Sequence, residues 1–206
     1  FLHCWNCSTT TVEVWRFDLS SLQRTNLTST VENLPSNGRT AFANGWFGSR
    51  EEFVIFGGLV GSQLAAVSAA DTLIYFPRNN SIVNITSYSG SAPSARAWSA
   101  HYVYGENLYV FGGGDGAKCY NDLWKFHIVT RMWMEVKVPL HRTSVTPSAL
   151  CASVMAIQYD EISISGGYQH GFVQNLKNFI FDITSSVWKF DGDLPFSLSP
   201  TSWVED

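Results

Sequence analysis

Short apolar runs bounded by turn residues recur along the chain and predict β-strands. In one stretch, residues 97–104 are rich in alanine and aromatic residues, 105–107 read Gly-Glu-Asn, and 108–111 form an apolar run. A run, a turn and a second run in this order are typical of a β-hairpin. No part of the chain has a sustained 3.6-residue hydrophobic period, so we expect an all-β protein.

A glycine doublet follows a predicted strand three times, at intervals of 55 and 54 residues. The doublets are Gly57 and Gly58, Gly112 and Gly113, and Gly166 and Gly167, the last preceded by Ser165 rather than Phe. Glycine suits a position where two backbones crowd together or φ is positive, because a side chain would obstruct both. The doublets therefore mark an internal structural repeat.

Large apolar residues follow each doublet at matching places. The first set, inside a short apolar run, is Tyr75, Phe126 and Phe181. Seven residues further on stand Ile82, Trp133 and Trp188. Each period has room for four short strands. Such a unit cannot bury both faces by itself, so repeated units must stack, and radial stacking of four-stranded sheets produces a β-propeller.

Doublet, aromatic residue and tryptophan together resemble the kelch repeat, and the stretch Pro93 to Arg96 resembles its pre-blade loop. The resemblance implies a propeller of four-stranded antiparallel blades, six or seven in most members. This chain supplies about three and a half repeats, so we expect a partial propeller. The alternative is that the two ends combine into a fourth blade and close a small ring.

The repeat alignment divides the chain into five parts. Residues 1–34 would be strands 3 and 4 of a truncated repeat, and 194–206 the first strand of a further blade. Whole kelch blades are expected at 35–90, 91–144 and 145–193.

Strand direction places the connections between strands 2 and 3, and those between blades, on one face. These are the longer loops, and long loops on a rigid scaffold commonly bind partners. The resemblance implies that an arginine after the pre-blade proline lines a pocket mouth, and the matching residues are Arg39 and Arg96. The third and fourth copies lack this arginine and have Leu150 and Trp203 at the equivalent positions. An arginine fork suits an acidic peptide; the alternative is a loop charge beside a carboxylate.

An aromatic loop follows the third doublet and contains Tyr168, His170 and Phe172. We interpret it as a contact surface for a partner, with packing between blades as the alternative. The chain is thus predicted to be a non-enzymatic interaction or scaffold module that binds a protein partner, other blades or subunits. The alternative is a carbohydrate-binding or galactose-oxidase-like propeller whose site is completed by missing blades.

Composition excludes several other functions. Thirteen Lys and Arg against seventeen Asp and Glu give a net charge of −4, so the chain has no basic field for nucleic acid. No apolar run is long enough to cross a bilayer, so we expect no membrane insertion. The five histidines lack metal-ligand spacing and no phosphate-binding glycine loop occurs, so neither a metal nor a cofactor is expected. The histidines are His3, His101, His127, His141 and His170.

Cysteines and sequons bear on the compartment. Cys4 and Cys7 form a CxxC that fits a zinc knuckle, a redox pair or part of a disulfide pattern, and Cys119 and Cys151 complete an even number. Four N-glycosylation sequons occur, at Asn6, Asn26, Asn79 and Asn84. Asn26 and Asn84 are expected on outer strands, Asn79 in a turn and Asn6 in a loop between strands 2 and 3. This placement, with the even number of cysteines, favours a secreted glycoprotein, with a cytoplasmic scaffold as the alternative.

Overall fold

The structure, a computed structural model, describes residues 13–36, 38–61, 65–86, 91–138 and 145–194. Three four-stranded antiparallel sheets dominate it. Each sheet is one blade, and its four strands lie side by side in the order in which they occur along the chain. The first blade has β4 (Ala43–Phe47), β5 (Glu52–Phe56), β8 (Thr72–Phe76) and β9 (Ser81–Asn84). The second has β10 (Ala100–Tyr104), β11 (Asn107–Phe111), β12 (Leu123–His127) and β13 (Met132–Glu135). The third has β14 (Val154–Gln158), β15 (Glu161–Ser165), β18 (Lys177–Asp182) and β19 (Val187–Asp193).

The remaining elements are small. A two-stranded sheet of β1 (Trp15–Asp18) and β2 (Gln23–Asn26) precedes the first blade, followed by one 3₁₀ turn, η1 (Thr28–Thr30). β3 (Arg39–Thr40), β6 (Leu59–Val60) and β7 (Val67–Ser68) form one short sheet, and β16 (Tyr168–Gln169) pairs with β17 (Val173–Gln174). The predicted strand at 194–206 lies outside the described residues apart from Leu194.

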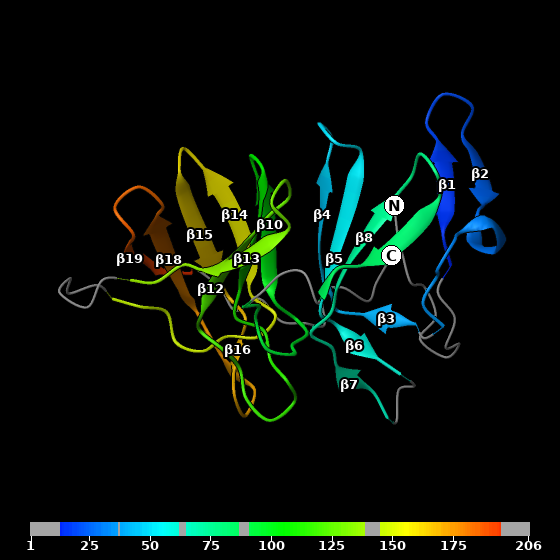
Figure 1. The fold of residues 1–206 in the computed structure, drawn as a ribbon. Coiled ribbons are helices and arrows are strands. Elements are labelled where there is room, and N and C mark those ends of the chain that lie inside the picture. The colour runs from blue at the N-terminus through cyan, green and yellow to red at the C-terminus, as the bar shows by residue number, and fades with distance from the viewer. Residues whose placement is uncertain (1–12, 37, 62–64, 87–90, 139–144, 195–206) are drawn as a thin grey trace.

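The blades are arranged side by side along an open arc (Figure 1), with β1 and β19 at opposite ends. The first strands of successive blades are neighbours, because β10 contacts both β4 and β14. The all-β prediction and the propeller blades are confirmed, and the sheets of the described residues do not close into a ring. The residue boundaries predicted between successive repeats remain a prediction.

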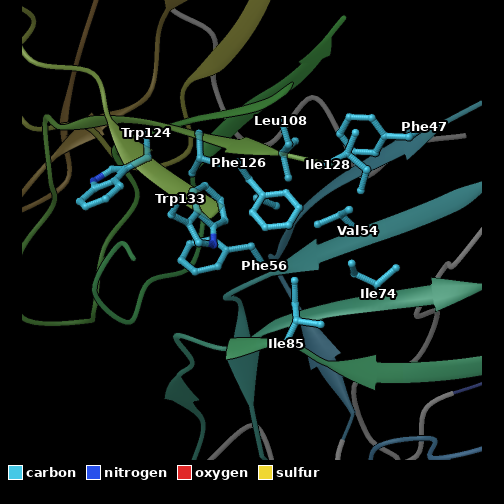
Figure 2. Close-up of a cluster of buried hydrophobic side chains, with 12 residues drawn as sticks. Phe47, Val54, Phe56, Ile74, Ile85, Leu108, Trp124, Phe126, Ile128 and Trp133 are labelled. Carbon is cyan, nitrogen blue, oxygen red and sulfur yellow. The ribbon is translucent and has the colours of Figure 1, made fainter. Parts of the chain in front are cut away.

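Apolar side chains fill the gaps between blades (Figure 2). Trp133 of the second blade packs against Phe56 of the first, with ring centroids 4.6 Å apart, and against Phe126 of its own blade at 5.2 Å. Its indole N–H donates to the Thr72 hydroxyl of the first blade at 3.0 Å. Trp188 repeats the arrangement one blade later, between Phe111 and Phe181 at 5.6 and 5.0 Å. Each tryptophan therefore joins two blades.

The glycine doublets lie where the next repeat crosses the end of a strand. Gly57 has a φ of +65°, and a Cβ on it would lie 2.5 Å from the Arg96 carbonyl oxygen. Gly58 N–H donates to that same oxygen at 2.7 Å. In the next repeat the Gly113 N–H donates to the Leu150 carbonyl at 2.8 Å. The backbones approach too closely for a side chain, and φ is in the region that favours glycine.

A short backbone ladder also links the blades. Trp98 N–H donates to the Ala41 carbonyl at 2.9 Å, and Ala152 N–H donates to the Trp98 carbonyl at 2.8 Å. The three residues occupy equivalent places, each two residues after position 39, 96 or 150. All three have positive φ, at 53°, 54° and 54°. This ladder positions each strand that enters a blade relative to the one before it.

Candidate functional site

The longer connections of all three blades lie on one side of the molecule, opposite the tight turns (Figure 1). We call this side the loop face and define it by residues 57–61, 65–71, 112–122 and 166–176 together with 91–99 and 145–153. Two of these connections carry short hairpins, β6–β7 and β16–β17. The opposite side, where strand 1 turns into strand 2 and strand 3 into strand 4, is the hairpin face.

One backbone bridge recurs beneath the loop face in every blade. The chain entering the blade pairs with the residue that follows the doublet: Thr40 with Leu59, Ala97 with Gly114, and Cys151 with Tyr168. The loops therefore start from a fixed backbone frame. Side chains between the bridges are held on a rigid support, as binding residues on a scaffold are.

Arg96 is the most completely bonded side chain on this frame. Its guanidinium donates to both carboxylate oxygens of Asp122, at 2.6 and 2.9 Å, and to the Gly112 carbonyl at 3.0 Å. It also donates to the carbonyl and the hydroxyl of Ser94, at 3.0 and 3.1 Å. These five bonds use all five N–H groups of an arginine, and the side chain is only 1% exposed. The structure thus places Arg96 inside the loop frame and not at an open pocket mouth, which argues against direct contact with a partner.

Arg39 forms the same clamp in the first blade. It donates to both oxygens of Asp71, at 2.7 and 2.6 Å, and to the Gly57 carbonyl at 2.6 Å. Each arginine thus ties the entering loop to the first glycine of the doublet and to the carboxylate before strand 3. Sequence reasoning missed Asp71 and Asp122. The available signal was an aspartate four residues before the repeat aromatic in the two repeats that carry the arginine.

The third blade has lost both partners of the clamp. Leu150 stands at the arginine position and Lys177 at the aspartate position, four residues before Phe181. The buried Asn175 replaces the guanidinium as donor to the doublet, since its amide group binds the Gly166 carbonyl at 2.9 Å and the Lys177 carbonyl at 3.0 Å. The doublet carbonyl is therefore satisfied without an arginine.

The aromatic loop of the third blade is divided between buried and exposed residues. Tyr168 is partly buried, and its backbone N–H and carbonyl pair with Cys151 at 2.8 Å each. His170 is exposed. Phe172 is 89% exposed at a φ of 61°. Trp98, which sequence reasoning did not select, is also on this face and 42% exposed.

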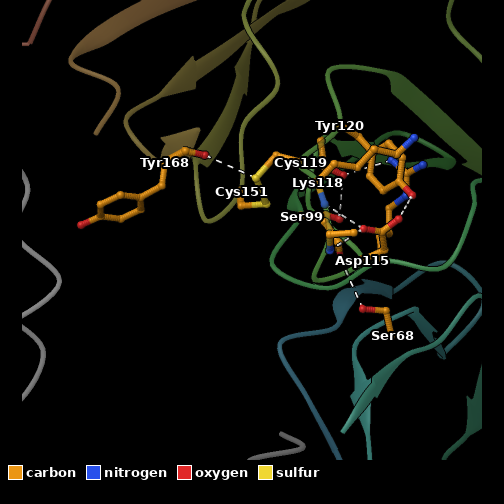
Figure 3. The surroundings of a disulfide bond; sticks show 12 residues. Ser68, Ser99, Asp115, Lys118, Cys119, Tyr120, Cys151 and Tyr168 are labelled. Carbon is orange, nitrogen blue, oxygen red and sulfur yellow. Dashed lines mark hydrogen bonds between the residues drawn. A yellow bond between two sulfur atoms is a disulfide. The ribbon is translucent and has the colours of Figure 1, made fainter. Parts of the chain in front are cut away.

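A disulfide joins two blades at the loop face (Figure 3). Cys119, in the long loop of the second blade, is bonded to Cys151 at the entry to the third, across a sequence separation of 32. Closing a loop of that length stabilises a folded chain by about 2–4 kcal/mol. Cys4 and Cys7 lie outside the described residues.

Asp115 organises the loop that carries Cys119. Its carboxylate accepts the Tyr120 hydroxyl at 2.7 Å and the backbone N–H groups of Ala117 and Lys118 at 2.9 and 3.0 Å. These hydrogen bonds, the one from Tyr120 foremost, lower the pKa of Asp115 to about 2. The loop therefore keeps its internal bonds at any pH well above that value.

The three sequons within the described residues lie on the surface. Asn26 ends β2, Asn79 is in the turn before β9, and Asn84 ends β9; all three are exposed. Asn6 lies outside the described part. Across the described ranges, no three His, Cys, Asp or Glu side chains gather in a way that could hold a metal ion. The same ranges contain no helix with the length and apolarity of a membrane span.

Comparison with known proteins gives two similarities. The family model described as the KLHDC2/KLHL20/DRC7 Kelch-repeats domain matches residues 5–195. A stretch of 60 residues is 38% identical to Tip elongation aberrant protein 1 of Schizosaccharomyces pombe. That stretch covers 27% of this chain and 5% of the length of the yeast protein.

Proposed function

The chain belongs to the kelch-repeat family, whose domains typically mediate protein–protein interaction, and from this premise we propose that its loop face binds a protein or peptide partner without catalysing a reaction. The proposal rests on a rigid array of blades with its long loops on one side. Arg39 and Arg96 would serve it by holding the loops in place, because their guanidinium groups are occupied within the fold.

The observation that carries the proposal is the pair of exposed aromatic side chains, Phe172 and Trp98, on that face. Aromatic residues are enriched among the few side chains that dominate binding energy at interfaces. Both also have positive φ, a conformation that costs a bulky residue of order 1–3 kcal/mol. For Trp98 the positive φ belongs to the interblade ladder, so it is the exposure of both rings on the loop face that favours a role in recognition, and His170 lies in the same loop as Phe172.

Photo-crosslinking tests the proposal with a control of matched geometry. Tyr159 is on the hairpin face, is 86% exposed and has a φ of 51°, so it matches Phe172 in exposure, backbone conformation and aromatic character but lies on the opposite side of the molecule. A crosslinkable residue at position 172 should capture a partner in the native source, and one at 159 should not. Phe172→Ala should then weaken that partner's binding about tenfold or more, and Tyr159→Ala less than about twofold. Equal capture and equal loss at both positions would contradict the proposal.

We also propose that the protein occupies an oxidising, secretory or extracellular compartment. Support comes from the Cys119–Cys151 disulfide and from the exposed sequons at Asn26, Asn79 and Asn84. Intact mass from the native source should fall on enzymatic removal of N-glycans, and neither cysteine should react with a thiol reagent before reduction. An unchanged mass together with two reactive thiols would favour a cytoplasmic scaffold instead.

A further inference from the structure

In the third blade, three residues at the positions that enclose the Arg96 guanidinium in the second blade line an open space. We propose that this space is a subsite for a peptide segment that carries a carboxylate side chain next to an apolar one. The inference rests on the proposed function, because it gives the chemistry of one part of the ligand bound at the loop face. It is carried by a comparison between two repeats of the same chain.

In the second blade, three residues enclose the guanidinium of Arg96. Ser94 accepts two of its hydrogen bonds, Asp122 accepts two more, and the ring of Tyr120 lies against it with 4.2 Å between the guanidinium carbon and the ring centroid. The pocket around this cation thus consists of acceptors and an aromatic face. Arg96 fills it completely.

The third blade presents the same three positions around a cavity. The alignment of Pro93 with Pro147 gives the equivalents of Arg96, Ser94, Tyr120 and Asp122, which are Leu150, Ser148, Asn175 and Lys177. The last three line a cavity of about 560 Å³. This volume lies within the range of small-ligand sites, roughly 300–1,000 Å³.

The walls of this cavity are mainly apolar. Leu176, Phe179 and Phe190 line it, and the two phenylalanine rings meet edge to face with centroids 5.8 Å apart. Val145 contributes from the entering loop. Phe190 is half-exposed, so its ring offers a surface for an aliphatic or aromatic side chain.

At the aspartate position, an acceptor has been replaced by a donor. Lys177 replaces the carboxylate of Asp122, and its ammonium group lies 5.8 Å from the centroid of the Phe190 ring. Within the described ranges no carboxylate comes within 4.0 Å of that ammonium group. Thr146 and Ser148 line the same cavity, and a hydroxyl group can donate as well as accept a hydrogen bond. A cation and two hydroxyl donors suit a carboxylate in place of the guanidinium.

Asp193, at the end of β19, also lines the cavity. It is the residue directly opposite Lys177 in the β18–β19 pairing, so the cavity carries one charge of each sign, and Asp193 can accept a hydrogen bond from a peptide N–H while Lys177 binds a carboxylate. Apolar walls, with a cation and an acceptor on neighbouring strands, together fit a peptide segment that presents a carboxylate side chain and a backbone N–H.

Refilling the cavity provides the test. The double variant Leu150→Arg/Lys177→Asp rebuilds the clamp of the second blade and should occupy the space. The probe is a random library of hexapeptides, acetylated and amidated at their ends so that only side chains carry charge. Selection on the unmodified chain should enrich Asp or Glu next to Leu, Ile or Phe. The enriched peptides should bind the double variant at least about tenfold more weakly, and Glu→Gln in the peptide should have a similar effect.

Lys177→Gln keeps the test decisive if the double variant does not fold. Lys177 is exposed, so this change should leave the melting temperature unchanged and remove the preference for acidic peptides. Peptides that bind all variants equally, or selection with no acidic preference, would overturn the subsite. If binding instead depends on Phe172 alone, the proposal that the loop face binds a partner is supported and the proposed subsite is overturned. If no peptide is enriched, the subsite falls and crosslinking at position 172 decides on the loop face by itself.

Discussion

Replacing Trp133 by alanine is expected to lower the free energy of unfolding by about 3–5 kcal/mol, the range for truncating a fully buried aromatic side chain. The indole is enclosed by Phe56 and Phe126, so its removal leaves a cavity between two blades. The Thr72 hydroxyl, which is buried, also loses its donor. Guanidinium chloride unfolding, followed by tryptophan fluorescence and circular dichroism, gives the free energy.

Met134→Ala is the matched control, because Met134 lies on the same strand, one residue further, and is 60% exposed. Its loss should stay within about 0.5 kcal/mol. Trp188→Ala should resemble Trp133→Ala, since Trp188 joins the second and third blades in the same way. Ile82, at the equivalent place in the first blade, should tolerate alanine better, because a smaller side chain leaves a smaller cavity. Similar values for Trp133 and Met134 would contradict the interblade packing.

Arg96→Leu is expected to cost about 2–4 kcal/mol, although leucine is the residue that the third blade carries at this position. The change leaves the Asp122 carboxylate without its partner and the Gly112 carbonyl without its donor. The value lies below that for a fully buried pair because Asp122 is partly exposed and can be hydrated. Arg39→Leu should cost less, since Arg39 makes three such hydrogen bonds and Arg96 makes five.

A double-mutant cycle with Asp122→Asn isolates the pair. If the carboxylate matters chiefly through Arg96, the two changes together should cost less than the sum of their separate losses, by about 0.5–3 kcal/mol. Strict additivity, or a loss below about 1 kcal/mol for Arg96→Leu in urea unfolding, would mean that the clamp does not hold the loop.

The sequence pattern was sufficient to predict the blades because repetition multiplies weak signals. A doublet such as Gly112 and Gly113 says little alone, but its recurrence in phase with Phe126 and Trp133 requires one four-stranded unit. The roles of the arginines were harder to predict. An arginine in a loop reads as an exposed charge unless its partner is known, and Asp122 is 26 residues away.

The cavity in the third blade could not be read from the chain at all. Leu150 and Lys177 stand where the second blade has the Arg96–Asp122 pair, and this change can be interpreted only because the second blade shows which side chains occupy the equivalent positions. The short strands β6 and β16 were not predicted from the sequence, for a different reason. Two-residue strands are too brief to leave a period in the sequence and are fixed by pairing with neighbouring backbone.

The ladder through Ala41, Trp98 and Ala152 separates the geometry of the blade array from its chemistry. Because main-chain atoms make these links, the spacing between blades does not depend on which side chain each position carries. Alanine and tryptophan indeed occupy equivalent places with nearly identical φ. Substitutions at these three positions can therefore change the side-chain surface of the loop face while the backbone links that set the spacing of the blades remain in place.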